Sequence, residues 1–436
     1  MTQSEKQSLN QETKNRRWFL RFRIGLKSLQ TDRRKLILLI IYIVLMLSIW
    51  LFREQIFMAE EIMLFSELKR SLVAILLPLY GGTGLFAIIV AFGTPFGSTA
   101  MSNDLRRAGL INHARETPLL VARYRSKNNP RVTILEFEAC GIPRSEWENK
   151  QIKIEAALNL NVAKITDGKN RRRILLHTVK SDCGLPEVIH WKKANLKHES
   201  FVLVLGESLL GPATVNLAHI PHILLGGSTG SGKSVLLKLL LMQCLEKGSI
   251  VSIADFKGGV DFTRIWHRKC RMCFDETDLT ALLSGTVDEL ERRKAAFSDA
   301  GCPNIDKYNK ATGAGLPRLI FACDEVAELL DKNGRSKEDK EQISKIENRL
   351  SIIARQGRAF GIHLILATQR PDATILSGQI RNNIDCRVCG RADNVLSQII
   401  LDNTAASELI PKDARGRFLL HDGTIFQGYL FDEKSL

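Results

Sequence analysis

The chain has 436 residues, of which 62 are lysine or arginine and 47 are aspartate or glutamate, giving a formal net charge of +15. With 44% hydrophobic and 25% charged residues it can bury enough apolar surface to fold, which excludes disorder as its main state and also a collagen-like class. Nine cysteines, an odd number spread over a long chain, exclude a disulfide scaffold and fit a reducing, intracellular location.

The positive charge is concentrated in the first half of the chain. Residues 1–35 carry a net +7, residues 36–100 a net −1, residues 101–200 a net +8, and residues 201–436 only +1. At about 100 to 200 residues per domain, the length allows two or three folded units. We predict a basic cytoplasmic N-terminus (1–35), a two-helix anchor (36–93), a basic mixed α/β adaptor domain (94–200) and one large neutral domain (201–436).

Two uncharged apolar runs, residues 36–52 and 71–93, lie near the N-terminus. A helix that crosses a bilayer needs about 20 apolar residues, so both runs are long enough to span a membrane. The positive-inside rule predicts a cytoplasmic N-terminus, a short acidic external loop (53–70), and a cytoplasmic location for everything after residue 94. The alternative is a signal peptide followed by a core helix, which we disfavour because no small-residue cleavage pattern follows the first run.

The segment 101–200 mixes strand-like runs at 132–137 and 173–179 with a helical stretch near 145–158. Its basic clusters, 171–173 and 192–193, suit a solvated face or anionic lipid headgroups, and they also suit DNA phosphates. The sequence alone does not separate these two interpretations.

A phosphate-binding loop follows the strand-like run 222–225 and precedes a leucine-rich helix that ends near Gly248. Residues 227–234 read GSTGSGKS, which is the G-x-x-x-x-G-K-[ST] pattern in its strand–loop–helix context. Backbone N–H groups of such a loop surround phosphates, Lys233 is expected to bridge the β- and γ-phosphates of ATP, and Ser234 to hold Mg²⁺. The predicted nucleotide-binding residues are Gly227, Ser228, Thr229, Gly230, Ser231, Gly232, Lys233 and Ser234.

A second apolar run, 319–323, leads directly into Asp324 and Glu325. A buried parallel strand delivers such carboxylates at its carboxyl end, where ligands bind in parallel sheets. We predict that Asp324 holds Mg²⁺ through water and that Glu325 polarises the attacking water. The alternative is an ordinary strand that ends in a helix-capping aspartate.

A third apolar run, 361–368, ends in Gln369-Arg370-Pro371, and a fourth, 249–254, precedes a glycine-containing loop at 255–259. Gln369, at a strand tip, is the candidate sensor of the γ-phosphate, whereas His363, in mid-strand, is expected to be structural. Alternating strands and helices from 220 to 430 predict an α/β fold with a parallel sheet, of the P-loop ATPase class.

Two cysteine pairs, Cys270/Cys273 and Cys386/Cys389, allow a four-cysteine zinc site in principle. The second pair lies in a predicted strand, where a three-residue offset turns the two side chains to opposite faces. We therefore interpret these cysteines as small buried hydrophobic residues.

Seven stretches of the C-terminal half, in their order and spacing, resemble the FtsK/SpoIIIE family of DNA-translocating ATPases. They are 203–211 (LVLGESLLG), 216–222 (NLAHIPH), 289–293 (ELERR), 304–309 (NIDKYN), 361–371 (GIHLILATQRP), 380–384 (IRNNI) and 400–402 (ILD). The resemblance implies a RecA-like motor that uses ATP and Mg²⁺, assembles as a ring, typically a hexamer, around DNA, and is tethered to a membrane.

In such rings an arginine of the neighbouring subunit completes each ATP site by stabilising charge on the transferred phosphoryl group. Arg358 is the first candidate for this role and Arg381 the second.

Two departures from the family pattern narrow the expected role. Chromosome-segregating members usually carry several spans, a long linker and a C-terminal winged-helix reader, whereas two spans and one motor are expected here. This compact form resembles the FtsK-like coupling proteins of Gram-positive conjugative plasmids and integrative elements, whose partners would be a relaxase and channel proteins. The alternatives are a chromosome-partitioning translocase, an ATPase that powers protein secretion, and a membrane-bound ATPase that only recruits partners.

Overall fold

The computed structural model describes residues 3–57, 66–127, 129–256, 261–369 and 378–433. Arg370 and Pro371, most of the 255–259 loop and residues 58–65 of the predicted external loop lie outside the described residues. Contacts within the chain separate two compact units, residues 1–182 and residues 183–436. The predicted adaptor–motor boundary at residue 201 stays a prediction, although residues 183–200 belong to the second unit by their contacts.

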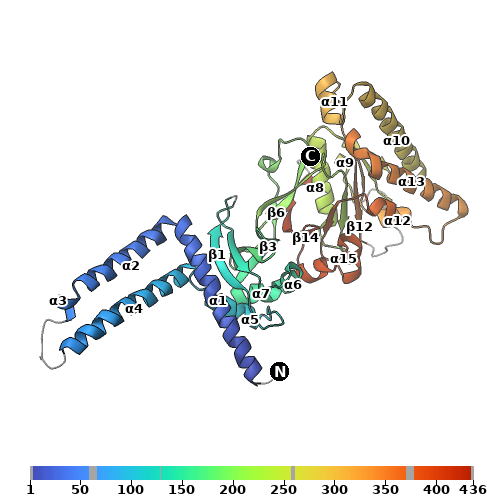
Figure 1. Cartoon of the computed structure of the whole chain (residues 1–436). Coiled ribbons are helices and arrows are strands. Elements are labelled where there is room, and N and C mark those ends of the chain that lie inside the picture. Colours follow the sequence, from blue (N-terminus) through green and yellow to red (C-terminus); the bar gives the residue numbers. More distant parts are fainter. Residues whose placement is uncertain (1–2, 58–65, 128, 257–260, 370–377, 434–436) are drawn as a thin grey trace. The chain divides into compact units, whose positions relative to one another are not determined.

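The first unit begins with helices, the two longest apolar ones being α2 and α4 (Figure 1). The helices are α1 Gln3–Thr31, α2 Arg33–Leu51, α3 Arg53–Phe57, α4 Ser66–Phe92 and α5 Ser98–Arg107. Asp32 caps α2 by accepting a hydrogen bond from the Arg34 N–H. Both α2 and α4 are long and apolar enough to cross a membrane, so the two predicted runs form the candidate spans.

Helices α2 and α4 pack as an antiparallel hairpin. Lys35 Nζ, at the start of α2, donates to the carbonyl of Phe92 at the end of α4 (3.0 Å), and the Tyr42 hydroxyl donates to the carbonyl of Gly81 (3.1 Å). A Cβ at Gly84 would lie 2.1 Å from the Tyr42 hydroxyl oxygen. Glycine at this position therefore lets the two helices approach closely, as small residues do between membrane helices.

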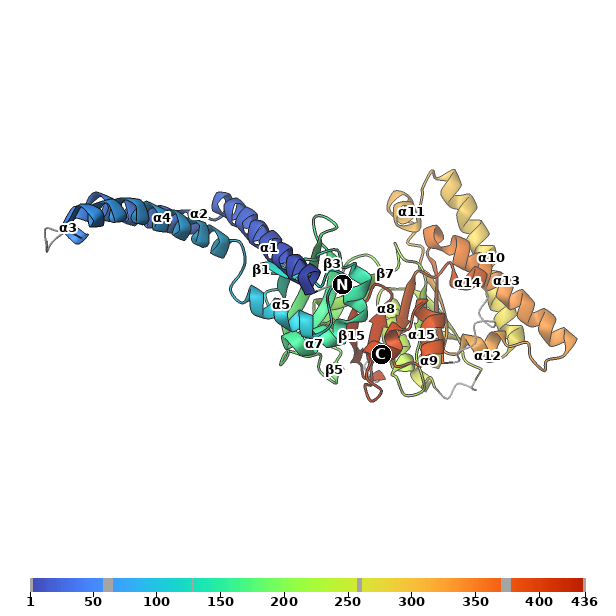
Figure 2. The same cartoon turned by 60° about the horizontal axis from the view of Figure 1, so that its bottom comes forward.

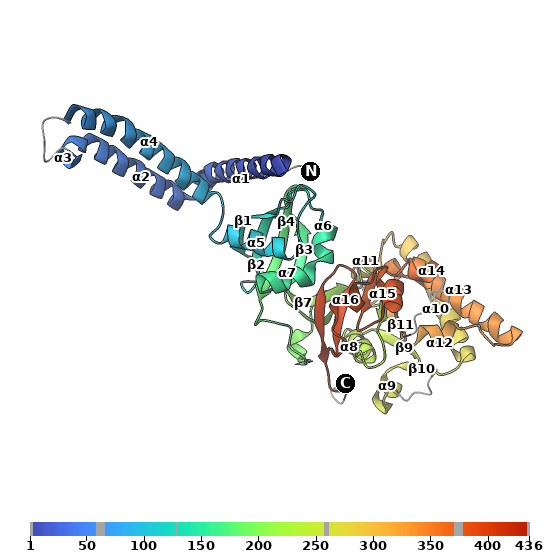
Figure 3. The same ribbon diagram turned by 90° about the horizontal axis from the view of Figure 1, so that it is seen from below.

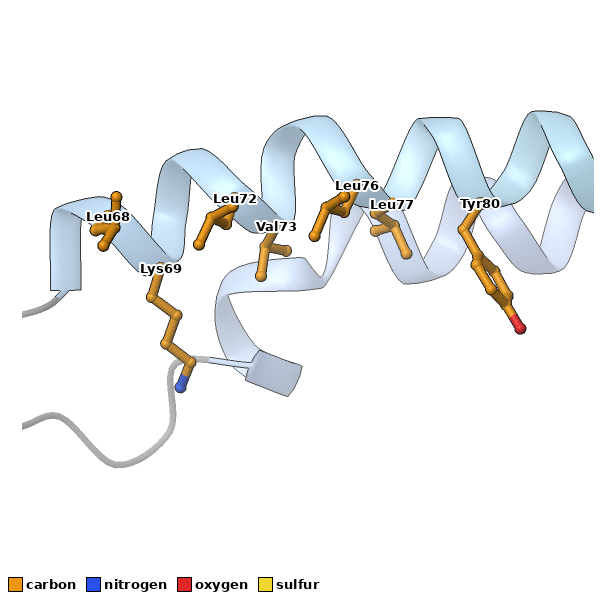
Figure 4. A pocket seen from close by; sticks show the side chains of 7 residues that line it. All are labelled: Leu68, Lys69, Leu72, Val73, Leu76, Leu77 and Tyr80. Carbon is orange, nitrogen blue, oxygen red and sulfur yellow. The ribbon is translucent and has the colours of Figure 1, made fainter.

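The outer surface of α4 carries a stripe of apolar side chains (Figure 4). Leu68, Leu72, Leu76 and Tyr80 recur every fourth residue, which places them on one face of the helix, and Leu68 and Tyr80 are 61% and 76% exposed. Such an exposed apolar stripe is unfavourable in water and suits lipid contact. Lys69 lies near the start of the stripe, where a long cationic side chain can reach a lipid headgroup.

The rest of the first unit is a four-stranded antiparallel sheet in the order β1-β2-β4-β3, with helices on one face (Figure 3). Its elements are β1 Leu119–Arg125, β2 Thr133–Glu138, α6 Arg144–Asn149, α7 Gln151–Leu158, β3 Leu160–Asp167 and β4 Arg173–Lys180. The core consists of alternate strand residues, such as Leu135 and Phe137, packed against Leu105, Trp147 and Ile154 of the helices. The helix predicted near 145–158 is two short helices, because Lys150 leaves the helical conformation between them.

The basic cluster 171–173 divides in the structure. Arg171 and Arg172 are exposed in the turn before β4, whereas Arg173 lies 3.2 Å from Glu138 on the neighbouring strand. Only the two turn arginines therefore offer charge to an external anion.

The second unit contains the remaining elements around one large sheet. They are β5 Ile189–His190, the 3₁₀ turn Lys193–Asn195, β6 Val202–Ser208, β7 Gly211–Asn216, β8 Ile223–Gly226, α8 Lys233–Glu246, β9 Ile250–Ala254, α9 Arg264–Lys269, β10 Arg271–Cys273, α10 Glu276–Asp299, α11 Ile305–Thr312, β11 Leu319–Cys323, α12 Val326–Leu330, α13 Lys337–Phe360, β12 Ile362–Thr368, α14 Gly378–Arg381, β13 Cys386–Cys389, α15 Asn394–Leu401, α16 Ala405–Leu409, β14 Arg417–Leu420 and β15 Ile425–Leu430.

The sheet has eleven strands, ten of them in the order β10-β9-β11-β12-β8-β13-β14-β15-β6-β7, with β5 paired to β15. The strands from β10 to β13 are parallel, which confirms the predicted parallel α/β sheet. Strands β13, β14, β15, β6 and β7 pair antiparallel, an extension that the sequence did not predict. Tight connections between consecutive strands, such as β6–β7, make antiparallel pairing the natural outcome there.

Helices cover both faces of the parallel strands, and α10 and α13 pack together on one of them (Figure 2). Ser336 caps α13 by accepting from the Asp339 N–H, and Gly361, with φ of 71°, ends it. All seven residues of β12 are buried, as expected of a strand between two helical layers. His363 in this strand is hydrogen-bonded through both ring nitrogens, to Arg318 and to the Pro221 carbonyl, so its structural role is confirmed.

The cysteines are free thiols, and their positions argue against a shared metal site. Cys273 ends β10, whereas Cys386 and Cys389 lie on β13, and four strands separate these two in the sheet. At about 4.8 Å per strand, the pairs are on the order of 20 Å apart. Burial raises the pKa of the Cys386 and Cys389 thiols to about 12, and Cys183 is the exposed cysteine of the nine, all of which lie in the described part.

Candidate functional site

The predicted phosphate-binding loop, residues 227–234, joins the carboxyl end of β8 to the start of α8. Gly230 and Gly232 have φ of 76° and 97°, a left-handed conformation that glycine adopts without strain, and Gly232 caps α8. The Ser231 N–H donates to the Ser228 carbonyl (3.0 Å), which closes the loop into a turn. The N–H groups at the start of a 14-residue helix make this a favourable position for an anion.

Lys233, Ser234 and Asp324 meet beneath the loop. Lys233 Nζ donates to Asp324 Oδ1 (2.8 Å) and to the Asp324 carbonyl (2.6 Å), and Ser234 Oγ donates to the same carboxylate oxygen (2.9 Å). The Lys233 and Asp324 side chains are only 3% and 4% exposed. A buried cation, a hydroxyl and a carboxylate thus converge where β8 and β11 end.

Glu325 is held by the tip of β12. Thr368 Oγ1 donates to Glu325 Oε1 (2.7 Å), and the Gln369 N–H donates to Oε2 (2.8 Å). Two donors of this kind fix the plane of the Glu325 carboxylate. Each oxygen retains a second lone pair that can accept from a water.

Gln369 connects the strand tip to the loop, because its Oε1 accepts from Thr229 Oγ1 (2.8 Å). The sensor candidate is therefore in contact with both Glu325, through its backbone, and the phosphate-binding loop, through its side chain. Gln369 thus links Glu325 to the phosphate-binding loop.

Neither arginine candidate joins this group in the described part of the chain. Arg358 is exposed in the last turn of α13, which leads into the amino end of β12, the edge of the sheet opposite the loop. Arg381 ends the short helix α14, and its carbonyl accepts from Arg387. Both arginines stay predictions for a role in a neighbouring subunit.

Arg391, which no sequence motif indicated, braces the loop from outside. Its guanidinium donates to the carbonyls of Thr229 (2.5 Å) and Lys412 (2.8 Å), and its own carbonyl accepts from the Ser228 N–H (2.7 Å). The position of Arg391 in the sequence could have indicated this contact. Arg391 follows strand β13 by two residues, and β13 ends beside β8.

A second brace comes from the loop before β14. The Gly416 N–H donates to the Ser231 carbonyl (2.8 Å), and a Cβ added at Gly232 would lie 3.1 Å from Gly416 Cα. Backbone therefore packs against backbone here, which explains why small residues occupy both positions.

These residues fit a magnesium nucleotide. A Cβ at Gly227 would lie 2.5 Å from Ser231 Oγ, so the loop's closed curvature depends on glycine. A lysine, the N–H groups at a helix N-terminus and a hydroxyl–carboxylate pair are the groups that a triphosphate with a hard divalent cation requires.

Comparisons with known proteins agree with this geometry. A family model described as the FtsK/SpoIIIE family matches residues 185–315. The DNA translocase SftA of Bacillus subtilis is 33% identical over 213 residues, which are 46% of this chain and 21% of that protein. The DNA translocase FtsK of Treponema pallidum is 28% identical over 306 residues, 65% of this chain and 37% of that protein.

Those matches span less than two fifths of the length of these curated relatives. A solved structure described as the pCW3 conjugation coupling protein TcpA, monomer form with ATPγS, is covered more fully. It is 33% identical, with a TM-score of 0.58, and the match covers 78% of this chain and 96% of that one.

Proposed function

The chain belongs to the FtsK/SpoIIIE family, and on that premise we propose that it is a membrane-anchored, ATP-driven DNA translocase that serves as the coupling protein of a conjugative transfer system. The observation that carries the motor assignment is the convergence of Lys233, Ser234 and Asp324 beneath the glycine-rich loop. We assign the motor to residues 201–436 and the basic adaptor to residues 94–200.

In this proposal the loop N–H groups and Lys233 bind the phosphates of ATP. Lys233 Nζ, now 2.8 Å from Asp324 Oδ1, turns toward the β- and γ-phosphates when a nucleotide enters. Ser234 Oγ and Asp324 Oδ1, which lie 2.9 Å apart, would hold Mg²⁺. The metal would supply positive charge that stabilises charge developing on the phosphates.

Glu325 orients the water that attacks the γ-phosphate. Its carboxylate is fixed by Thr368 and by the Gln369 backbone, so it can accept a hydrogen bond from that water in a constant direction. Gln369 bridges to Thr229 and is placed to transmit the loss of the γ-phosphate to the tip of β12. Arg358 or Arg381 of a neighbouring subunit would complete the site in a ring.

A role in conjugation is supported by the likeness to the TcpA coupling protein, which extends over 96% of that chain at 33% identity. The chromosome translocases resemble this chain over a much smaller share of their own length. A relaxase and the proteins of a transfer channel are the partners that this role requires.

Membrane anchoring is supported by the α2–α4 hairpin and its charges. Helix α2 has 19 residues, about 28 Å of helix, which is close to the roughly 30 Å of a bilayer core. Arg53 stacks 4.7 Å from the ring of Trp50 at one end of α2, and Lys35 lies at the other. With the excess of N-terminal basic residues, this arrangement favours a cytoplasmic N-terminus and motor.

DNA-stimulated hydrolysis of ATP by the full chain in detergent tests the proposal. We expect single- or double-stranded DNA to raise the rate, and the stimulation to weaken as salt rises, because phosphate contacts release counterions. Intact basal hydrolysis that no DNA stimulates would contradict the translocase assignment.

A mating assay tests the conjugative role. Replacing wild type by Glu325→Gln should abolish plasmid transfer while the protein stays in the membrane fraction, and Glu338→Gln, on the exposed start of α13, serves as the matched control. Normal transfer by the Glu325→Gln strain would remove the motor from the explanation.

A further inference from the structure

A cavity of about 450 Å³ borders the phosphate-binding loop. Gly230 and Gly232 of the loop and Val235 of α8 form one wall. Asp324, Glu325 and Gln369 do not line it. Because those three residues mark the position of the γ-phosphate, the cavity lies toward the end of the loop where the nucleoside of a bound nucleotide must emerge.

The walls of this cavity are largely apolar, and several of their side chains are exposed to solvent. Six large apolar residues of the described part of 183–436 are exposed, and three of them line the cavity: Val188 (58%), Val235 (38%) and Leu430 (43%). The volume lies within the range of roughly 300–1,000 Å³ that is usual for small-molecule sites. Tyr429 and Phe418 add aromatic surface, and Glu187 and Arg415 add polar groups.

A second wall is formed by Glu187, Val188 and Ile189. They belong to the segment 185–191, which precedes the predicted motor and which we call the strap. Arg417 donates to the carbonyls of Leu185 (3.0 Å) and Pro186 (3.1 Å), and Gln427 Nε2 donates to the carbonyl of Glu187 (2.8 Å). These bonds hold the strap beside the opening, since Gln427 is only 3% exposed and cannot move far.

The far end of the strap is a strand. Ile189 and His190 pair in parallel with Tyr429 and Leu430, and the Trp191 N–H donates to the Leu430 carbonyl (2.8 Å). The strap thus pairs with the carboxyl end of β15, while its Val188 side chain stays exposed at the cavity.

We propose that this cavity is the nucleoside pocket of the ATP site, with the purine between Val188 of the strap and Val235 of α8. Nucleotide binding then stabilises the docked strap, so that the polypeptide leading into the motor senses occupancy of the site. This inference rests on the proposed ATP-binding function and adds the strap as a nucleotide-responsive element.

Competition binding tests the pocket in the full chain in detergent, with Mg-ATP and Mg-tripolyphosphate displacing a fluorescent ATP analogue. A carboxylate beside the base is unfavourable, so Val188→Asp should weaken ATP binding by roughly tenfold or more and leave tripolyphosphate affinity within about twofold of wild type. Val395→Asp is the matched control, because Val395 is 55% exposed in the same unit but does not line the cavity.

Equal ATP affinity of Val188→Asp and wild type would overturn the pocket while leaving the ATPase intact. Failure of wild type to bind either ATP or tripolyphosphate would instead refute the proposed function itself.

Hydrogen exchange of the wild-type chain tests the strap without any substitution. Saturating ATP should slow exchange of the Trp191 amide and its neighbours, whereas saturating tripolyphosphate should not, because it lacks the base. Identical exchange of residues 185–191 with both ligands, alongside protection of the phosphate-binding loop, would refute the strap's role.

Discussion

The two sheets of this chain differ in how many of their faces are buried. The sheet of residues 119–180 has helices on one face, so Leu176 of β4 is fully buried while its neighbour Leu175 is only half-buried. The parallel strands of the second unit have helices on both faces, so Ile365 and Leu366 of β12 are both completely buried. Two-sided burial keeps the strands rigid, and their carboxyl ends hold the side chains of the candidate site in place.

The largest expected effect is that of replacing the buried Lys233, which should impair the second unit and leave the first unchanged. Lys233→Ala removes the cation that faces the phosphates, and we expect ATP hydrolysis to fall by about 100-fold or more. Membrane fractionation should be unchanged, because the first unit is untouched. Lys340→Ala, on the exposed start of α13, is the control and should hydrolyse ATP normally; near-normal hydrolysis by Lys233→Ala would show that the loop is not the active site.

Alanine substitutions in β12 and β4 test the burial comparison directly. Ile365→Ala and Leu366→Ala should each cost about 3 kcal/mol, because both leave cavities in a packed core. In β4, Leu176→Ala should cost about 3 kcal/mol and Leu175→Ala only about 1 kcal/mol. Urea unfolding followed by proteolysis, with cleavage sites assigned to each unit, measures these changes in the free energy of unfolding. Equal losses for the two β4 variants would contradict the difference in burial.

Acid should destabilise the second unit through its buried histidines. Burial lowers the pKa of His222 to about 4 and that of His363 well below its ordinary value, with Arg318 adding to the effect on His363. Because the unfolded chain protonates first, this stability is complete above about pH 6.5 and is lost toward pH 4, at about 1.4 kcal/mol per pH unit for each histidine.

The variant His222→Asn tests this pH dependence, because it removes one of the two titrating histidines. Its unfolding free energy, measured from pH 7 to 5, should fall less steeply than that of wild type. An unchanged slope would mean that His222 does not titrate on unfolding.

The smallest expected effect concerns the brace that the sequence analysis missed. Arg391→Ala removes hydrogen bonds to the Thr229 and Lys412 carbonyls but no group that faces the phosphates. We expect ATP to bind about five- to tenfold more weakly, in line with the loss of one or two charged hydrogen bonds. Arg264→Ala, at the start of α9, is the control, and unaltered ATP affinity of Arg391→Ala would show that the loop keeps its shape alone.

The predictability of each region follows from its burial. Strands β8, β9, β11 and β12 are continuous apolar runs and were all predicted, as was the placement of Asp324 after β11. In the first unit β2 and β4 were predicted, but β1 and β3 were not. Strands with one buried face alternate with polar residues, so β3 (LNVAKITD) has only a weak apolar signal.

The site was predictable where chemistry lies within a short motif and not where it depends on distant segments. The loop and Lys233 could be identified locally, whereas the contact of Arg391 with Thr229 joins residues 162 positions apart. The strap was missed for the same reason, since its partners Arg417 and Gln427 lie more than 230 positions away. Only the folded sheet brings these segments together.

The uneven exposure of the cysteines makes the natural chain suited to thiol labelling. Burial raises the pKa of Cys244, Cys270, Cys323, Cys386 and Cys389 to about 12, so these thiols stay protonated and unreactive toward maleimides at neutral pH. Cys183 is exposed and is the first residue of the second unit, just before the strap. A fluorophore or spin label on Cys183 would therefore report in real time on the segment that leads into the strap.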